Sequence, residues 1–407
     1  MTTGLFIRCA QRGQVAPVVL FGVLIASAAL VLMFNTSQKV TERSQVANAA
    51  DAAAYSGAVW VARHLNFMAY TNRAMVANHA AVGHFVSHVS WVRYVHDSIE
   101  YIDRVTQWIP YVGQYIDMVE EIAEQVREIT EQSADIAVPA IDAWNANFRA
   151  AQAEAQASLA LNNLTELMRA TARAYDPDIR INDRDELSAL PAEIQAVLDG
   201  NVLTQLAAVS SFVSRYTASN DRGSVQELIA GSIEANMDMQ RWITGERGWR
   251  ETGLGFRLRK RGRTTTTQNA NGADWRASDE LQYGTRRVFG WSSWRRIGEE
   301  TSTANATEFD SDYSGVPAYY NVAGSPSERG LRIAAIATKR EAQIRTADLL
   351  GMMSGSPIAV AATARVEFRR PGSNAFTALA SNEREYSHLF NPLWEAKLAP
   401  FELASAR

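Results

Sequence analysis

The most constraining feature of this 407-residue sequence is one uninterrupted apolar run close to its start. From Val15 to Phe34 the only polar side chain is Ser27. Twenty residues are enough for a helix to cross a hydrocarbon core of about 30 Å at about 1.5 Å per residue. A cleavable signal has a shorter apolar region, followed by a small-x-small cleavage site. The residues after Phe34 contain no such site, so the run predicts a membrane anchor over residues 14–34.

The charges that flank the run predict its orientation. Arg8, Arg12 and the terminal amino group lie on the short leader, residues 1–13. Short positively charged segments stay in the cytoplasm, whereas long domains translocate largely regardless of charge. We therefore expect a single-pass membrane protein with a cytoplasmic leader and a body outside the cytoplasm. Within the anchor, Gly22 and Ala26 form a small-xxx-small pair that permits close helix packing, although such a pair is also ordinary membrane-helix composition.

Composition narrows the class of protein. The net charge of −4 gives no global reason to expect nucleic acid. The single cysteine, Cys9, precedes the anchor, so no disulfide can form within the body.

Helical patterns dominate residues 35–244. No proline occurs between Val18 and Ile109, which favours one long, extended helix. Further helices are expected over 115–133, from Pro139 to about Tyr175 and over 191–244. Small apolar residues recur in the first helix at steps of three and four, typical of a face that packs closely against a partner helix: Ala47, Ala50, Ala54, Ala58, Val61, Leu65 and Met68.

The pattern changes at Gly245. Residues 245–330 are rich in arginine, tryptophan and threonine, and predict a β-rich insert with at least one hairpin at the turn signal Asn269–Gly272. Residues 331–407 predict a short helix over 331–350 and a strand over 357–370. The predicted fold class is therefore α+β: a transmembrane helix that continues into a long helical region, in a mostly α body with a β-rich C-terminal part.

The sequence contains few candidates for chemistry. His84 and His88 are spaced i,i+4 and could share a metal ion on one helix face, but surface histidines on an amphipathic helix explain them equally well. There is no G-x-S-x-G elbow and no phosphate-binding loop. We therefore expect no cofactor, no metal and no small-molecule substrate, with an exported metalloenzyme built on His84 and His88 as a weaker alternative.

A basic run lies among tryptophans in the β-rich insert. Basic and aromatic residues together suit an anionic polymer or surface, whereas a solvated strand face with tryptophans as core residues is the simpler interpretation. The candidate contacts are Arg257, Arg259, Lys260, Arg261 and Arg263.

Several stretches resemble the TadE/TadG-like proteins of tight-adherence (Tad, or Flp) pilus assembly. They are "RGQVAPVVLFGVLI" (12–25), "NAADAAA" (48–54) and, like a TadG-related subset, "RHLNFMAYTNRAMVANHAAVGHF" (63–85) and "FNPLWEAKLAP" (390–400). The resemblance implies a pilin-like, non-catalytic component that works with other pilus-assembly membrane proteins and inner-membrane lipid.

The resemblance also implies a processing site. A prepilin-type peptidase would cleave after Gly13 and leave Gln14 as the new N-terminus, with a glutamate expected five residues into the mature chain. Val18 stands at that position. Without this carboxylate a subunit is better suited to cap, initiate or stay in the membrane than to be repeated along a filament. The predicted function is a minor pilin or assembly component acting through helix–helix association. The alternative is an anchored envelope-binding module that uses the arginine- and tryptophan-rich region.

Overall fold

The computed structural model describes most of the helical region and the cores of the sheets. The residues it describes are 15–106, 113–159, 161–183, 185, 218–219, 247–269, 272–287, 290–313, 315, 319–320, 331–340, 357–368 and 392–400. The predicted helix over 191–244 therefore lies almost wholly outside the described residues.

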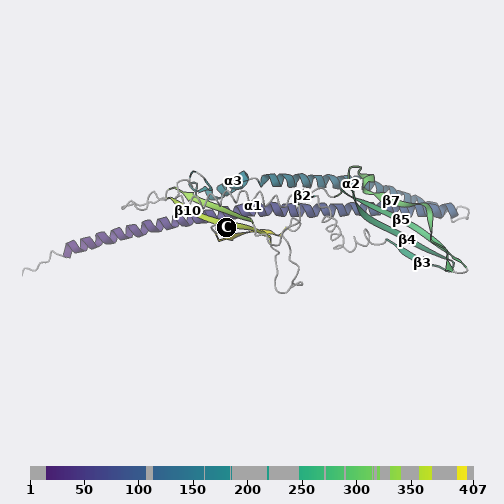
Figure 1. The fold of residues 1–407 in the computed structure, drawn as a ribbon, viewed down its shortest axis with the longest axis horizontal. Coiled ribbons are helices and arrows are strands. Elements are labelled where there is room, and N and C mark those ends of the chain that lie inside the picture. The colour runs from purple at the N-terminus through teal and green to yellow at the C-terminus, as the bar shows by residue number, and fades with distance from the viewer. Residues whose placement is uncertain are drawn as a thin grey trace, which may run out of the picture.

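One helix, α1 (Val15–Thr106), organises the molecule. Its 92 residues correspond to a rod of about 140 Å at about 1.5 Å per residue. Figure 1 shows α1 running through nearly the full length of the ribbon, with every other described element packed beside its later part. The long extended helix predicted from the absence of proline is confirmed.

Two further helices cover one side of α1. The helix α2 (Gly113–Ser158) returns antiparallel to α1, and the shorter α3 (Leu161–Arg173) follows it. The sequence predicted two helices separated before Pro139, but the structure contains a single helix with Pro139 inside it. An internal proline is costly for an isolated helix. Here Ala134 and Val138 are fully buried in the same core as α1 residues, which holds the helix together through this position.

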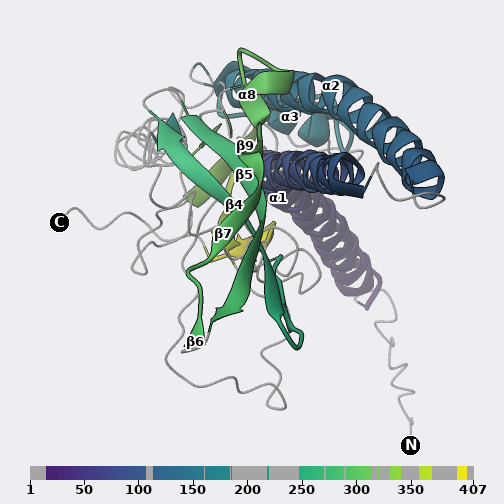
Figure 2. The ribbon, with the colours of Figure 1, turned by 90° about the vertical axis from the view of Figure 1, so that its right-hand side faces the viewer.

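Antiparallel sheets cover another side of α1 (Figure 2). The first, sheet A, has the order β1-β9-β10-β11, and the second, sheet C, has the order β3-β4-β5-β6, with β7 also paired to β5. A two-stranded ribbon, β2-β8, and the short helix α8 (Ala306–Phe309) complete the described elements. The strands are β1 (Arg180–Ile181), β2 (Ala218–Ser219), β3 (Trp249–Thr252), β4 (Phe256–Asn269), β5 (Gly272–Arg287), β6 (Gly290–Trp291), β7 (Arg295–Asn305), β8 (Tyr319–Tyr320), β9 (Leu331–Lys339), β10 (Ile358–Phe368) and β11 (Trp394–Ala399).

The β-rich insert and its hairpin are confirmed, and one C-terminal prediction is wrong. The strands β4 and β5 pair in continuous register up to Asn269 opposite Gly272. Residues 331–339, predicted as part of a helix, form strand β9 between β1 and β10. A short apolar run does not distinguish a buried strand from a buried helix by its period, and β9 is buried along nearly its whole length.

The hydrophobic core has two parts along α1. Near the anchor, α1 residues from Val46 to Met68 pack with α3 and sheet A. Farther along, α1 residues from Met75 to Val89 pack with α2 and sheet C. A buried polar contact lies between them, where Gln152 Nε2 of α2 donates to Thr71 Oγ1 and Asn72 Oδ1 of α1, both at 2.6 Å.

Candidate functional site

The first candidate site is the bare apolar start of α1. The most hydropathic window of this helix, mean hydropathy 2.7, has none of its residues buried, and Phe21 and Leu24 are more than half exposed. Its length and composition are those of a membrane anchor or a signal segment. A helix this apolar and this uncovered requires a lipid or protein environment.

The small residues of this segment are open to a partner. A Cβ added to Gly22 would meet no atom within 4 Å, and Ala26 is exposed. The surface that would admit a second helix closely is therefore free within the described structure. The predicted cleavage residues, Gly13 and Gln14, lie outside the described residues.

The small apolar face farther along α1 is covered by the chain itself. Its members Ala50, Ala54, Ala58, Val61, Leu65 and Met68 are fully buried, and Ala47 is half-buried. They pack against α3 and against strands β9 to β11. Gly57 lies within this face, and a Cβ there would stand 3.2 Å from Met168 Sδ and from Ile333 Cγ2. Where the sequence suggested a partner helix, the structure places the chain's own α3 and sheet.

Sheet C is fixed to α1 by a buried ion cluster. The Asp279 carboxylate is completely buried and accepts from Arg247 Nη2 at 2.6 Å and from Lys260 Nζ at 2.8 Å. Ser90 Oγ of α1 donates to the same carboxylate at 2.7 Å. Two cations around one carboxylate give a satisfied network whose removal would leave buried charge unpaired.

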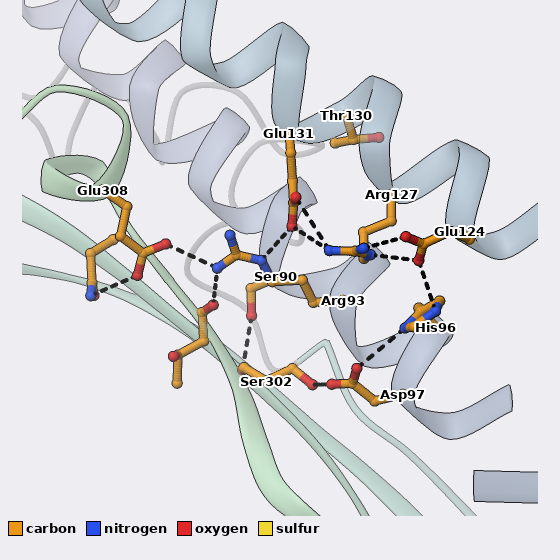
Figure 3. A network of polar contacts seen from close by, with 12 residues as sticks. Ser90, Arg93, His96, Asp97, Glu124, Arg127, Thr130, Glu131, Ser302 and Glu308 are labelled. Atoms are coloured by element: carbon orange, nitrogen blue, oxygen red, sulfur yellow. Dashed lines mark hydrogen bonds and ion pairs between the residues drawn. The ribbon is translucent and has the colours of Figure 1, made fainter. Parts of the chain in front are cut away.

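A second polar network joins α1, α2 and sheet C (Figure 3). Arg93 of α1 donates to Glu131 of α2 at 2.7 Å, to the Thr303 carbonyl of β7 at 2.7 Å and to Glu308 of α8 at 2.9 Å. Desolvation lowers the pKa of Arg93, but its bonds to Glu131 and Glu308 outweigh this effect and raise that pKa. One guanidinium therefore connects α1 with α2 and with the contiguous elements β7 and α8.

The predicted basic run divides between the two faces of β4. Lys260 lies on the face toward α1, within the buried ion cluster and 4.8 Å from the centre of the Tyr94 ring. Arg261 and Arg263 are exposed on the opposite face. Because side chains alternate along a strand, Lys260 is structural here and the arginines alone form a surface.

The strand register adds arginines that the sequence did not group with this run. Arg250 of β3 lies opposite Arg259 of β4. Arg259 lies opposite Gln282 of β5, which in turn lies opposite Arg296 of β7, so the three arginines form one row across the sheet. Only the pairing of the strands reveals this arrangement, since these residues are far apart in the sequence. We call this surface the arginine face: Arg250, Arg257, Arg259, Arg261, Arg263, Arg276 and Arg296.

A tryptophan lies within the arginine face. The guanidinium carbons of Arg257 and Arg259 each stand 4.2 Å from the Trp294 ring centre. Burial and the neighbouring charge of Arg261 lower the pKa of Arg259. Stacking on an aromatic ring therefore holds these arginines in place while like charge accumulates around them.

Carboxylates offset the arginine face only in part. Within the described part of the chain, Glu280 pairs with Arg296 at 3.4 Å and Asp274 with Arg276 at 3.6 Å. The exposed Arg261 and Arg263 have no such partner among the ion pairs of the described residues. The face thus has the excess positive charge that an extended polyanion would require.

The histidine pair of α1 does not gather further ligands in the described structure. The rings of His84 and His88 are stacked with centres 6.2 Å apart, and burial lowers the pKa of both. Among described residues, the one group of three potential metal ligands is instead His96, Asp97 and Glu100.

These three side chains already have partners. His96 Nε2 lies 2.8 Å from Glu124, Asp97 accepts from Ser302, and Glu100 pairs with Arg104 at 2.8 Å. Asp97 and Glu100 border a polar cavity of about 360 Å³ between the far end of α1 and sheet C. The contacts of His96 and Asp97 link α1 to α2 and to β7, whereas Glu100 pairs within α1.

Another histidine is fully enclosed. His79 lies between Trp275 of β5 and Tyr313, and its Nδ1 is hydrogen-bonded to the Tyr313 hydroxyl. Burial lowers the pKa of His79 to about 3. The Trp275 ring donates from Nε1 to the His79 carbonyl at 2.7 Å, so this neutral histidine belongs to the contact between α1 and sheet C.

The described architecture is that of a helical stalk with an apolar N-terminal segment and two sheets packed along it. In a comparison with family models, residues 13–61 match the Tad domain of putative TadE/G-like Flp pilus-assembly proteins. The match covers the apolar segment, the "NAADAAA" run and the first part of the small-residue face. Neither the curated proteins nor the solved structures contain a match to this chain.

Proposed function

We propose that this chain is a membrane-anchored, non-catalytic component of a tight-adherence pilus machine, with a cytoplasmic N-terminus and a periplasmic body. The observation that carries the proposal is the continuity of α1. One helix begins as a bare apolar segment within the region that matches the Tad domain, and continues without a break into the packed stalk. Such a helix transmits the position of the anchor rigidly to the body.

The proposal assigns association within the membrane to the anchor itself. The small-residue face from Ala50 to Leu65 is occupied by the chain's own α3 and sheet A, whereas Gly22 and Ala26 are uncovered. Close packing at small residues is a common mode of helix association in lipid. Val18 in place of a carboxylate favours a capping, initiating or machine-resident role over a repeated subunit.

Sequencing of the mature N-terminus together with cell fractionation tests this role. A Gln14 terminus and recovery from purified pili would identify a processed minor pilin. An intact Met1 with retention in the inner membrane would identify an assembly component. Recovery as a soluble protein that has lost residues 1–34 would overturn the anchored role in both forms.

The arginine face supports a second function, the binding of an anionic envelope polymer. The specific observation is that Arg261 and Arg263 are exposed beside a tryptophan-stacked arginine row with few carboxylates nearby. The variant R261A/R263A should elute from a heparin column at markedly lower salt than the natural chain. The matched control is Arg104→Ala, which removes an exposed arginine from the far end of α1. Equal elution of all three proteins would exclude this function.

A further inference from the structure

The helix α2 has a second apolar stripe on the side turned away from α1. Its face toward α1 is accounted for by the buried residues Ala134, Val138 and Asn145. On the opposite side Ile129 is 64% exposed and Ile136 is 74% exposed. Other large apolar side chains exposed on this helix are Met118, Val119, Ile122, Val126 and Trp144.

The stripe has the spacing of a coiled-coil seam. Positions 119, 122, 126, 129, 133, 136, 140 and 143 alternate steps of three and four residues, which is the a/d pattern of a heptad repeat. The seam is about 36 Å long at about 1.5 Å per residue. We call it the α2 seam, and its members are Val119, Ile122, Val126, Ile129, Ser133, Ile136, Ala140 and Ala143.

The fold of the described chain does not use the α2 seam. The ion pairs of α2 with α1 come from Glu124 and Glu131, which bind His96 and Arg93 on the inner side. Surface helices normally have one apolar face, which they turn to the core. A second apolar stripe of this length, exposed on a helix that is already packed, is typical of a protein-binding surface.

The charge around the seam defines the partner. Between residues 117 and 135 the helix has seven carboxylates and one arginine, Arg127. Gln125 and Gln132, at the g positions that border the seam, are uncharged. Glu121, Glu128 and Asp135 occupy the c positions, which lie farther around the helix on the same side. Long basic side chains on a partner could cross the glutamines to reach these carboxylates, whereas acidic side chains would be repelled.

The shape of the seam disfavours a second copy of this chain. In a parallel pair each core residue meets its own equivalent. Ser133, Ala140 and Ala143 would then face their equivalents and leave three thinly filled layers, in addition to bringing two acidic helices together. A different helix can place larger side chains opposite these small residues and basic side chains opposite the carboxylates.

We propose that the α2 seam binds an amphipathic helix of another protein, with apolar a and d positions flanked by lysine and arginine. This inference goes beyond the proposed function and does not depend on it, because the seam belongs to α2 and not to the anchor. It adds a docking surface on the stalk, far along the chain from the anchor.

The test uses the full chain in nanodiscs and two labelled peptides of about four heptads. Both peptides have leucine and isoleucine at a and d, and they differ only in having lysine or glutamate at e and g. Fluorescence anisotropy should show the lysine peptide binding at least about tenfold more tightly than the glutamate peptide, a difference of about 1.4 kcal/mol. Raising the salt concentration should weaken the binding of the lysine peptide.

Substitution of the seam provides the specific readout. The variant I129S/I136S should lose at least about tenfold in affinity for the lysine peptide. Its circular dichroism and melting temperature should be unchanged, since both side chains are exposed. The matched control is Leu254→Ser, which removes an exposed leucine from the β-rich part and should leave the affinity unchanged.

Three results would overturn the proposal. The first is absent or equal binding of the two peptides. The second is a disulfide between two copies formed by Ser133→Cys in a Cys9→Ser background, which would make the partner a second copy. The third is protection of Ile129→Cys from maleimide in the monomer, which would show that the chain covers its own seam. None of these results bears on the anchored role, which the N-terminal sequencing tests separately.

Discussion

Asp279 illustrates how single residues hold sheet C against α1. Its carboxylate is surrounded by Arg247, Lys260 and Ser90, which come from the segment before β3, from β4 and from α1. Loss of this charge would leave two buried cations without their partner.

We therefore expect Asp279→Ala to lower the free energy of unfolding by about 3–5 kcal/mol. The measurement is urea unfolding of the purified chain, followed by tryptophan fluorescence. Glu280→Gln is the matched control, because Glu280 is the neighbouring carboxylate on the opposite face of β5 and makes a partly exposed ion pair; it should cost less than about 1 kcal/mol. A similar effect of the two substitutions would contradict the structural role of the cluster.

His79 predicts a dependence of stability on pH. Its pKa in the folded chain is about 3, below the ordinary value of 6.5, because it is buried. As the pH falls, the imidazole is therefore protonated in the unfolded chain before it is protonated in the folded chain. The contribution of neutral His79 to the free energy of unfolding is complete above pH 6.5 and is lost as the pH falls toward 3.

Between pH 8 and pH 5 the contribution of His79 should fall by about 2 kcal/mol. Urea unfolding at both pH values measures this loss. His79→Gln should be less stable at pH 8 but should lose less stability on acidification. His88→Gln is the comparison, since the His88 side chain is exposed on the same helix. An unchanged pH dependence in His79→Gln would show that His79 does not contribute.

At the scale of elements, the packing of α1 against sheet C depends on a close approach at Gly83. A Cβ built there would lie 2.7 Å from Cε2 of the fully buried Trp275, closer than van der Waals contact allows. The indole cannot move easily, because it is enclosed and its Nε1 is bonded to the His79 carbonyl.

Gly83→Ala should therefore lower the melting temperature, although alanine is the better helix former by about 1 kcal/mol. Gly22→Ala is the matched helical control, because nothing surrounds that position. It should leave the melting temperature of the detergent-solubilised chain unchanged. If Gly83→Ala were stabilising, the contact between Gly83 and Trp275 would have to be looser than described.

At the scale of the whole molecule, α1 determines the shape. From residue 35 to Thr106 the helix continues for a distance of about 105 Å at about 1.5 Å per residue. A single globular domain of comparable chain length would be far more compact.

Negative-stain electron microscopy of the full chain in nanodiscs should therefore show a rod that extends about 105 Å from the disc. An anchored body that stays flat against the disc, or a compact particle beside it, would contradict a continuous α1. Insertion of a flexible glycine–serine segment after Asn35 should abolish the fixed direction of the rod and leave its length unchanged.

Much of this architecture followed from the sequence. The apolar run from Val15 to Phe34 predicted a helix long enough to span a membrane, because about twenty apolar residues in a helix match the thickness of a hydrocarbon core. The absence of proline up to Ile109 determined a long helix, and the alternation and turn signal around Asn269 determined a hairpin. These features are local, since each depends on side chains that are neighbours in the chain.

Only the tertiary structure decided which surfaces are free. The small-residue face at Ala54 and Ala58 reads as a docking surface in the sequence, yet β9 to β11 return from far along the chain to cover it. Lys260 reads as one of five basic contacts, yet strand pairing turns it inward to Asp279. The helix α2 buries the side that contains Ala134 and Val138 and leaves Ile129 and Ile136 exposed. Burial depends on contacts between distant segments, which no local pattern records, and for this reason the sequence determined the elements and the fold decided their exposed faces.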